Sequence, residues 1–278
     1  NQDRSEEAKQ YFEKALQLNP DDARAHNDLA LILAKDNPEQ AVIHYEKALQ
    51  IAPEFTLALN NWGNLLMELG RLDEAEAKYR EALRIREEDE YAWYNLARLA
   101  EMRGMYEEAT QDYLNAMENS PENSIIPNNL GLLYASLGRF DDAKAMYEKA
   151  LEIDAENPLP LNNLGVLAEQ QGNLDHAAEY YAKALQIKPA FLLALNNLRA
   201  ALEKLGRSDE MQGWYEKALE VQPENGDVHN SFGYYYYSQG NYDEARNHFQ
   251  LALQYIPQFP LACNNLGNVE LVQGDLDA

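Results

Sequence analysis

Residues 56–89 read TLALNNWGNLLMELGRLDEAEAKYREALRIREED, and this stretch decides the fold of the chain. Apolar residues recur at helical spacing from Leu59 to Leu69 and again from Ala75 to Ile85. Gly70 lies between the two patterns, where a helix commonly ends in a left-handed residue. The stretch therefore predicts two consecutive helices joined by a tight turn.

The same pattern returns along the chain at intervals of 34 residues. Glycine recurs at Gly70, Gly104, Gly138, Gly172, Gly206, Gly240 and Gly274. Alanine recurs at Ala75, Ala109, Ala143, Ala177 and Ala245, and in a second column at Ala82, Ala116, Ala150, Ala184, Ala218 and Ala252. An aromatic column contains Tyr79, Tyr113, Tyr147, Tyr181, Tyr215 and Phe249, and prolines end many units at Pro20, Pro53, Pro121, Pro189, Pro223 and Pro257.

Each column has a physical reason. Small residues let two helices approach closely, and the aromatic column fills the gap between neighbouring pairs. The aspartates at the start of each second helix are expected to cap free backbone N–H groups and to favour the helix dipole; they are Asp73, Asp141, Asp175, Asp209 and Asp243.

One helix pair cannot bury its own apolar face, so the pairs must stack. The sequence predicts an all-α solenoid of seven full units, at 22–55, 56–89, 90–123, 124–157, 158–191, 192–225 and 226–259. Residues 1–21 form a half-unit with a second helix only, from Glu6 to Leu18. Residues 260–278 form a half-unit with a first helix only, from Leu261 to Gln273.

The pattern resembles the tetratricopeptide repeat family over essentially the whole chain. The run Trp93–Leu96–Ala97, followed by Gly104, Ala109, Tyr113, Ala116 and Pro121, matches the family motif. The resemblance implies a right-handed superhelix whose first helices line a concave groove. It also implies a protein–protein scaffold or adaptor and names no partner.

Composition narrows the class of partner. The formal net charge is -24, from 23 basic and 47 acidic residues. Such a surface repels phosphate backbones, so we expect no nucleic acid and instead a neutral or basic protein or peptide. No apolar run approaches the ~18 residues that span a bilayer, so we expect no membrane insertion. Cys263 is the one cysteine of the sequence, which excludes an internal disulfide and a thiolate cage.

No enzymatic motif stands out. The five histidines fall in no metal-ligand spacing, and every glycine column serves a helix end, so no phosphate loop is present. His26 and His229 occupy the column of Trp93, which predicts that they fill the core. Acidic pairs such as Glu107–Glu108 lie at second-helix starts. We expect no catalytic residue, metal or cofactor.

Two adjacent columns on the first helices are rich in asparagine. The first column holds Asn61, Asn95, Asn129, Asn163, Asn197 and Asn265, and the second includes Asn60, Asn128, Asn162 and Asn196. An amide donates and accepts at once, matching a peptide unit, so these side chains are candidates for gripping an extended peptide. The alternative is that the first column ties neighbouring repeats together.

The Asn-Asn steps resemble the superhelix of the O-linked GlcNAc transferases, which leaves open a targeting arm of a larger enzyme. A second comparison is negative. Co-chaperone members of the family hold a carboxylate with lysine and arginine on their first helices, whereas lysine is missing from these columns here. Binding to chaperone tails is therefore not expected.

The run Tyr234–Tyr235–Tyr236–Tyr237 stands out in the unit 226–259. Its phase assigns Tyr236 to the core and predicts that Tyr234 and Tyr237 face the groove, where tyrosine suits a binding surface. The alternative is a well-packed aromatic core.

In the unit 192–225, Arg199 and Met211 replace small residues at both close helix crossings. We expect a wider helix pair there, with the Arg199 stem packed and its head reaching water or an acid.

The two half-units keep the small and aromatic columns, at Ala8, Phe12 and Ala15 and at Leu266 and Gly267. Each half-unit is expected to expose an apolar face. The face reflects either a longer array or end-to-end self-association into a filament.

Overall fold

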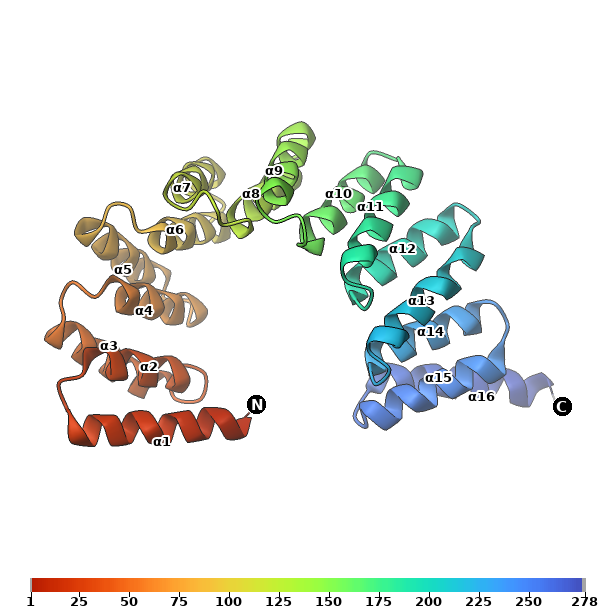
Figure 1. Ribbon diagram of the computed structural model, residues 1–278, viewed down its shortest axis with the longest axis horizontal. Helices are drawn as coiled ribbons and strands as arrows, with labels where there is room; N and C mark the ends of the chain where they lie inside the picture. The colour runs from red at the N-terminus through yellow and green to blue at the C-terminus, as the bar shows by residue number, and fades with distance from the viewer. Residues whose placement is uncertain (1, 277–278) are drawn as a thin grey trace. The chain divides into compact units, whose positions relative to one another are not determined.

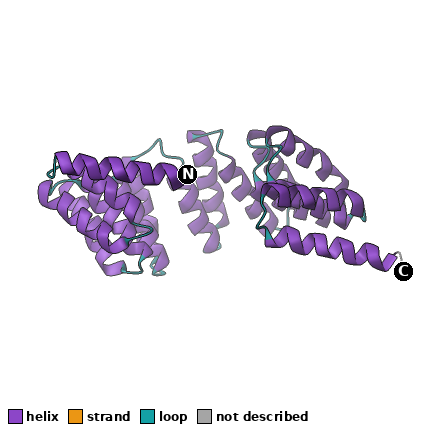
Figure 2. Cartoon of the chain, turned by 90° about the horizontal axis from the view of Figure 1, so that it is seen from below, coloured by secondary structure: helices purple, strands orange, loops and turns teal. Residues whose placement is uncertain are grey.

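The computed structural model describes residues 2–276, which form helices and connecting loops (Figures 1 and 2). The helices are α1 (Gln2–Leu18), α2 (Ala23–Leu33), α3 (Pro38–Ile51), α4 (Thr56–Glu68), α5 (Leu72–Ile85), α6 (Glu90–Met102), α7 (Tyr106–Asn119), α8 (Ile125–Ser136), α9 (Phe140–Ile153), α10 (Pro158–Gln170), α11 (Leu174–Ile187), α12 (Leu192–Lys204), the 3-10 turn η1 (Ser208–Glu210), α13 (Met211–Val221), α14 (Gly226–Ser238), α15 (Tyr242–Tyr255) and α16 (Pro260–Leu276). The fold is an all-α solenoid of antiparallel helix pairs.

Packing divides the helices into two compact units, Asn1–Leu133 and Tyr134–Ala278, with the boundary inside α8. In the first unit α1 packs on α2, and the pairs α2–α3, α4–α5 and α6–α7 follow in sequence. In the second unit α10–α11, α12–α13 and α14–α15 follow in the same way, and α16 packs on α15. Within each unit these helices therefore contact their neighbours in sequence, as a solenoid requires.

The turn within most pairs depends on glycine. Gly70, Gly104, Gly138, Gly172, Gly206 and Gly240 all have φ between 71° and 80°, the left-handed conformation predicted for a helix end. The prediction was wrong for Gly274, because α16 continues through it to Leu276. Helix α1 also begins earlier than expected, at Gln2 instead of Glu6.

The aromatic column forms the centre of each pair. The side chains of Tyr45, Tyr79, Tyr113, Tyr147, Tyr181, Tyr215 and Phe249 are fully buried or nearly so. The first helix of a pair lies close to the aromatic ring of the second. In α4–α5, a Cβ added at Gly63 of α4 would lie 2.4 Å from a ring carbon of Tyr79 of α5. The small columns therefore mark close crossings, as predicted.

The expectation that aspartates cap the second helices was wrong. The residues at the N-cap positions are Arg71, Met105, Arg139, Asn173, Arg207 and Asn241, and none makes a side-chain capping hydrogen bond. Asp73 lies one residue inside α5, where its charge still favours the helix dipole. Side-chain caps occur instead on α3, from Asn37, and on first helices, for example from Asp22 and Asp89.

The pair α12–α13 departs from its neighbours as predicted. The second helix starts with η1, and α12 packs less extensively on α13 than α10 packs on α11 or α14 on α15. Met211 is fully buried, and the Arg199 guanidinium lies 2.6 Å from the Glu203 carboxylate. The reduced packing is in the direction expected for two large side chains at the crossing.

Candidate functional site: the first-helix face

The first helices of consecutive pairs contact one another in both units. In the first unit α2 contacts α4, and α4 contacts α6. In the second unit α10 contacts α12, α12 contacts α14, and α14 contacts α16. These helices form a continuous layer in each unit, whose exposed side is called the first-helix face below.

Asparagine side chains join neighbouring first helices across this layer. In the first unit Asn61 Nδ2 donates to Asn27 Oδ1 at 3.0 Å, and Asn129 Nδ2 donates to the Tyr94 hydroxyl at 2.7 Å. In the second unit the equivalent bonds run from Asn197 to Asn162 at 2.9 Å, from Asn265 to Asn230 at 3.0 Å and from Ser231 to Asn196 at 3.4 Å. The first asparagine column therefore ties repeats together in the structure.

The second asparagine column lies mostly beneath the surface. Asn60 and Asn162 are only 2% and 1% exposed, and Asn128 is also buried, which corrects their placement as groove-lining residues. Asn60 donates at 2.9 Å to Asp89, a fully buried residue that also caps α6. Asn95 of the first column is buried as well. The partly exposed amides are those of Asn61, Asn129, Asn163, Asn196, Asn197 and Asn265.

A row of exposed apolar side chains lies four residues before the first asparagine column. It contains Leu57, Tyr91 and Ile125 in the first unit and Leu159, Leu193 and Leu261 in the second, each between 43% and 54% exposed. Residues four apart share a helix face, so each apolar side chain lies next to the amide of its own helix. The i, i+4 spacing was readable from the sequence, but the prediction left this row out of the site.

The second unit adds a cavity of about 370 Å³ on this face. It is lined by Asn196, Arg199, Asn230, Ser231, Tyr234, Leu261 and Asn265. Tyr234 is 43% exposed, and the guanidinium carbon of Arg199 lies 5.0 Å from its ring centre. Arg199 therefore brings a cation onto a face that is otherwise built from amides and apolar groups.

The other tyrosines of the run lie in the core or pack between α14 and α15. Tyr235 is buried, and Tyr236 stacks on Phe232 with ring centres 4.6 Å apart. Tyr237 is half-buried and packs edge-on against Tyr242 of α15. Tyr237 is therefore a packing residue between helices, and Tyr234 is the tyrosine that the structure places beside the cavity.

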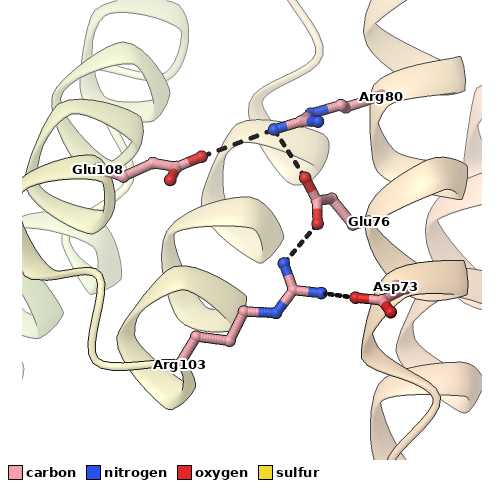
Figure 3. A network of polar contacts seen from close by, with 5 residues as sticks. All are labelled: Asp73, Glu76, Arg80, Arg103 and Glu108. Atoms are coloured by element: carbon pink, nitrogen blue, oxygen red, sulfur yellow. Dashed lines mark hydrogen bonds and ion pairs between the residues drawn. The ribbon is translucent and has the colours of Figure 1, made fainter.

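A network of ion pairs joins α5 to the end of α6 and to α7. Figure 3 shows the Arg103 guanidinium bridging Glu76 and Asp73 of α5, while Arg80 reaches Glu76 at 2.6 Å and Glu108 of α7 at 3.6 Å. Nearby on α7, Asp112 is buried. Burial and the negative charge of Glu108 raise the pKa of Asp112 to about 6.

His26 and His229 lie in the interior, as predicted, and are 4% and 6% exposed, whereas His44 and His248 are partly buried and His176 is exposed. Among residues 2–276, no three His, Cys, Asp or Glu side chains gather closely enough to hold a metal ion. None of the described helices has the length and apolar character needed to cross a bilayer.

The half-unit residues pack on their neighbours. Ala8, Phe12 and Ala15 are half-buried as α1 packs on α2, and Leu266 is half-buried near Phe249 and Val269. Gly267 is exposed. Larger apolar side chains remain open on the same two helices, at Tyr11, Leu18 and Leu271.

Comparison with known proteins identifies the family. Tetratricopeptide repeat models match residues 1–54, 60–124, 124–190, 194–228, 214–247 and 233–274. The chain belongs to the tetratricopeptide repeat family. Family and fold together define a scaffold for protein–protein interaction. A search of curated proteins found no matching sequence.

Solved structures share the fold at low sequence identity. Yeast Tom70 superposes with a TM-score of 0.72 at 18% identity, over 98% of this chain and 59% of Tom70. PilF of Pseudomonas aeruginosa gives 0.58 at 22% identity, over 74% of this chain and 96% of PilF. Cut9, solved with Hcn1, gives 0.55 at 18% identity over 93% of this chain. The chain spans 51% of the Cut9 chain.

Proposed function

We propose that the protein is a non-catalytic scaffold that holds an extended segment of a partner protein across its first-helix face. The observation that carries the proposal is the register of two rows on consecutive helices. Six first helices, α4, α6, α8, α10, α12 and α16, present an exposed apolar side chain and, four residues later, an asparagine, as at Leu159 and Asn163 and at Leu193 and Asn197.

The spacing of these rows suits an extended chain. Packed helices lie roughly 8–10 Å apart, and an extended peptide advances ~3.3 Å per residue. A partner segment with an apolar side chain at about every third residue therefore meets one apolar residue on each of these six helices. The partly exposed amides beside them offer hydrogen bonds to its main chain, and the net charge of -24 favours a neutral or basic segment.

The hydrogen bonds between asparagines of neighbouring helices use only one group of the donating amide, so its other group can bind a partner. In the pair formed by Asn197 and Asn162, Asn197 uses Nδ2 as the donor, so the Asn197 carbonyl oxygen is not the atom that makes this bond. A main-chain N–H of the partner can donate to that oxygen. The same side chain then supports the solenoid and contacts the ligand, which unites the two interpretations of the column.

The test is the affinity of an identified partner for a Leu159→Ser, Leu193→Ser double variant. Both side chains are exposed, so the fold is expected to persist. Loss of two apolar contacts of about 1 kcal/mol each weakens binding by roughly thirtyfold. The control is Val221→Ser, at an apolar side chain 60% exposed on a second helix of the same unit, which should leave affinity unchanged. Equal affinities for all three proteins would refute the proposal.

We also propose end-to-end self-association as a second function, because α1 and α16 leave Tyr11, Leu18 and Leu271 at least 65% exposed. The test is sedimentation over a wide concentration range with a Phe12→Glu variant alongside. Growth with concentration that the added charge abolishes supports it, and a monomer at every concentration contradicts it. The full-length sequence tests the third alternative, a targeting arm of a larger enzyme.

A further inference from the structure

Two histidine pairs occupy equivalent positions in the two units, and the proposed function uses neither. In the first unit His26 of α2 faces His44 of α3, with the two Nδ1 atoms 2.8 Å apart. In the second unit His229 of α14 faces His248 of α15, with the Nδ1 atoms 3.0 Å apart. The ring centres are separated by 5.1 and 5.2 Å, at interplanar angles of 35° and 32°. The same arrangement has thus been built twice.

The hydrogen bonds of each pair fix the positions of its protons. His26 Nε2 lies 3.1 Å from the Pro20 carbonyl oxygen, and His229 Nε2 lies 2.9 Å from that of Pro223. A carbonyl oxygen only accepts, so Nε2 carries the hydrogen and, in the neutral ring, Nδ1 is the acceptor. The second histidine of each pair then donates from its own Nδ1. The bond between the two Nδ1 atoms therefore needs one ring whose Nδ1 carries no hydrogen.

Added protons change this arrangement in two steps. The first proton leaves one Nδ1–H···Nδ1 bond, because one ring still offers a lone pair, but it places a positive charge on rings that are partly or largely removed from water. A second proton places N–H groups on both Nδ1 atoms, directly opposite each other. The hydrogen bond between the first and second helix is then replaced by repulsion.

The surroundings of the first pair do not cancel such a charge. A cavity of about 440 Å³ opens beside the pair, lined by Leu16 and Pro20 together with Asp21, Lys47, Gln50 and Ile51. Asp21 and Lys47 are the charged groups of this lining, one of each sign. Burial, His26 and Lys47, in that order, lower the pKa of His44.

The second pair is enclosed by aromatic rings. Phe232 and Tyr236 of α14 pack against His248, with ring centres at 4.4 and 5.6 Å, and Tyr255 of α15 stacks on His229 at 5.6 Å. Glu216 of α13 and Glu244 of α15 are the acidic groups close to Tyr236. Burial and the facing His229 lower the pKa of His248 to about 4.

Other repeats make the same helix-to-loop bond without a titratable ring. Trp93 stands in the column of His26 and His229, and its Nε1 donates to the Glu87 carbonyl oxygen at 2.8 Å. The α6–α7 pair therefore has an equivalent contact that does not change between pH 8 and pH 4. It serves as an internal reference for the two histidine pairs in an Asp112→Asn background, because the raised pKa of Asp112 on α7, about 6, otherwise makes α6–α7 sensitive to pH.

We propose that the two histidine pairs are proton-sensitive latches, which hold α2 against α3 and α14 against α15 when neutral and loosen on acidification. Each latch is destabilised when the first proton places a charge in the interior, and it loses the Nδ1–Nδ1 hydrogen bond when both rings are protonated. Since α14 carries part of the first-helix face, including Tyr234, the second latch couples that face to pH. The existence of the latches does not depend on the proposed binding function.

The sign of the effect follows from the lowered pKa values. The unfolded or opened state has ordinary histidines with pKa ≈ 6.5 and binds more protons than the folded state below that pH. The latch contribution is therefore complete above about pH 6.5 and is lost as pH falls from 6.5 towards the folded pKa, which is about 4 for His248. The first pair adjoins an open cavity, so α2–α3 is expected to respond first.

Hydrogen–deuterium exchange of the whole chain in the Asp112→Asn background between pH 7.5 and pH 4.5 tests the proposal. After correction for intrinsic exchange, protection of α14–α15 is expected to fall by up to tenfold per pH unit below 6.5, relative to α6–α7. His248→Gln should remove this dependence in α14–α15, and His44→Gln should remove it in α2–α3. The control is His176→Gln, at an exposed histidine of α11, which should leave both unchanged.

Two results would overturn the proposal. One is protection in both latch pairs that falls no faster than in α6–α7, and the other is a pH dependence that survives the glutamine substitutions. If a variant fails to fold, proton NMR titration of the unmodified protein decides the question. The His248 ring should remain neutral at pH 5.5, whereas titration near 6.5 contradicts the latch.

Discussion

A single methyl group added at Gly165 tests whether the 34-residue glycine column reflects close packing. A Cβ at this position would lie 2.4 Å from Cε1 and 2.6 Å from Cδ1 of Tyr181, distances that real contacts do not reach. Tyr181 is fully buried in the centre of α10–α11, so its ring cannot move aside freely. Overpacking of this kind costs ~1–3 kcal/mol, while replacing glycine by alanine within a helix returns up to ~1 kcal/mol. Gly165→Ala is therefore expected to destabilise the chain by about 1–2 kcal/mol.

The matched control is Gly213→Ala in α13, an exposed helical glycine around which no atom lies within 4 Å of an added Cβ. The same chemical change there is expected to stabilise by about 0.5–1 kcal/mol, because only the helix preference remains. Urea unfolding followed by circular dichroism measures both variants beside the unmodified protein. The reasoning is refuted if Gly165→Ala is as stabilising as Gly213→Ala.

Three further predictions concern charge and hydrogen bonds. Asn197→Ala removes the hydrogen bond to Asn162 and leaves the buried Asn162 acceptor without this donor. The free energy of unfolding, measured with urea, should therefore fall by ~1 kcal/mol. An unchanged free energy would mean that this hydrogen bond does not stabilise the fold. Arg103→Met breaks the network of Figure 3, and its cost of ~1 kcal/mol should shrink as salt is added; a cost independent of salt would contradict an electrostatic origin. The pKa of Asp112 is raised to about 6. Between about pH 4 and pH 6 the folded state therefore binds more protons than the unfolded state, so the free energy of unfolding falls as pH rises through that window. Asp112→Asn should remove this dependence and, after allowance for solvent screening, add ~1 kcal/mol at pH 7.5; an unchanged pH profile of the unfolding midpoint would contradict it.

The helix pairs were predictable because their signals are local. Gly70 predicts a left-handed turn, and Tyr79 predicts a side chain that fills the crossing between two helices. The structure shows both. Arg199 could be interpreted in the same way, since a large residue in a small column forces a separation. The helix end at Gly274 was misjudged because glycine permits a turn without requiring one.

The site was harder to predict, because its properties depend on a single step around a helix. Asn162 and Asn163 are adjacent in sequence, yet Asn162 is buried and Asn163 is partly exposed, since one residue turns the side chain by about 100°. The aspartates at second-helix starts lie two residues after the capping position, as Asp73 does after Arg71. The histidine pairs were missed for another reason: His26 and His44 come from different helices, and no helical period relates them.

Site-specific photo-crosslinking tests the central claim, that partners bind the first-helix face, most directly. A photoreactive residue is placed at Leu193, which is exposed on α12, and separately at the exposed Glu179 on the second helix α11 of the same unit. The partner is first isolated with the unmodified protein, and its binding by both labelled proteins is confirmed before illumination. A covalent adduct from Leu193 and none from Glu179 is the predicted result. Adducts from Glu179 alone would contradict the account, because the partner would then contact the second helices.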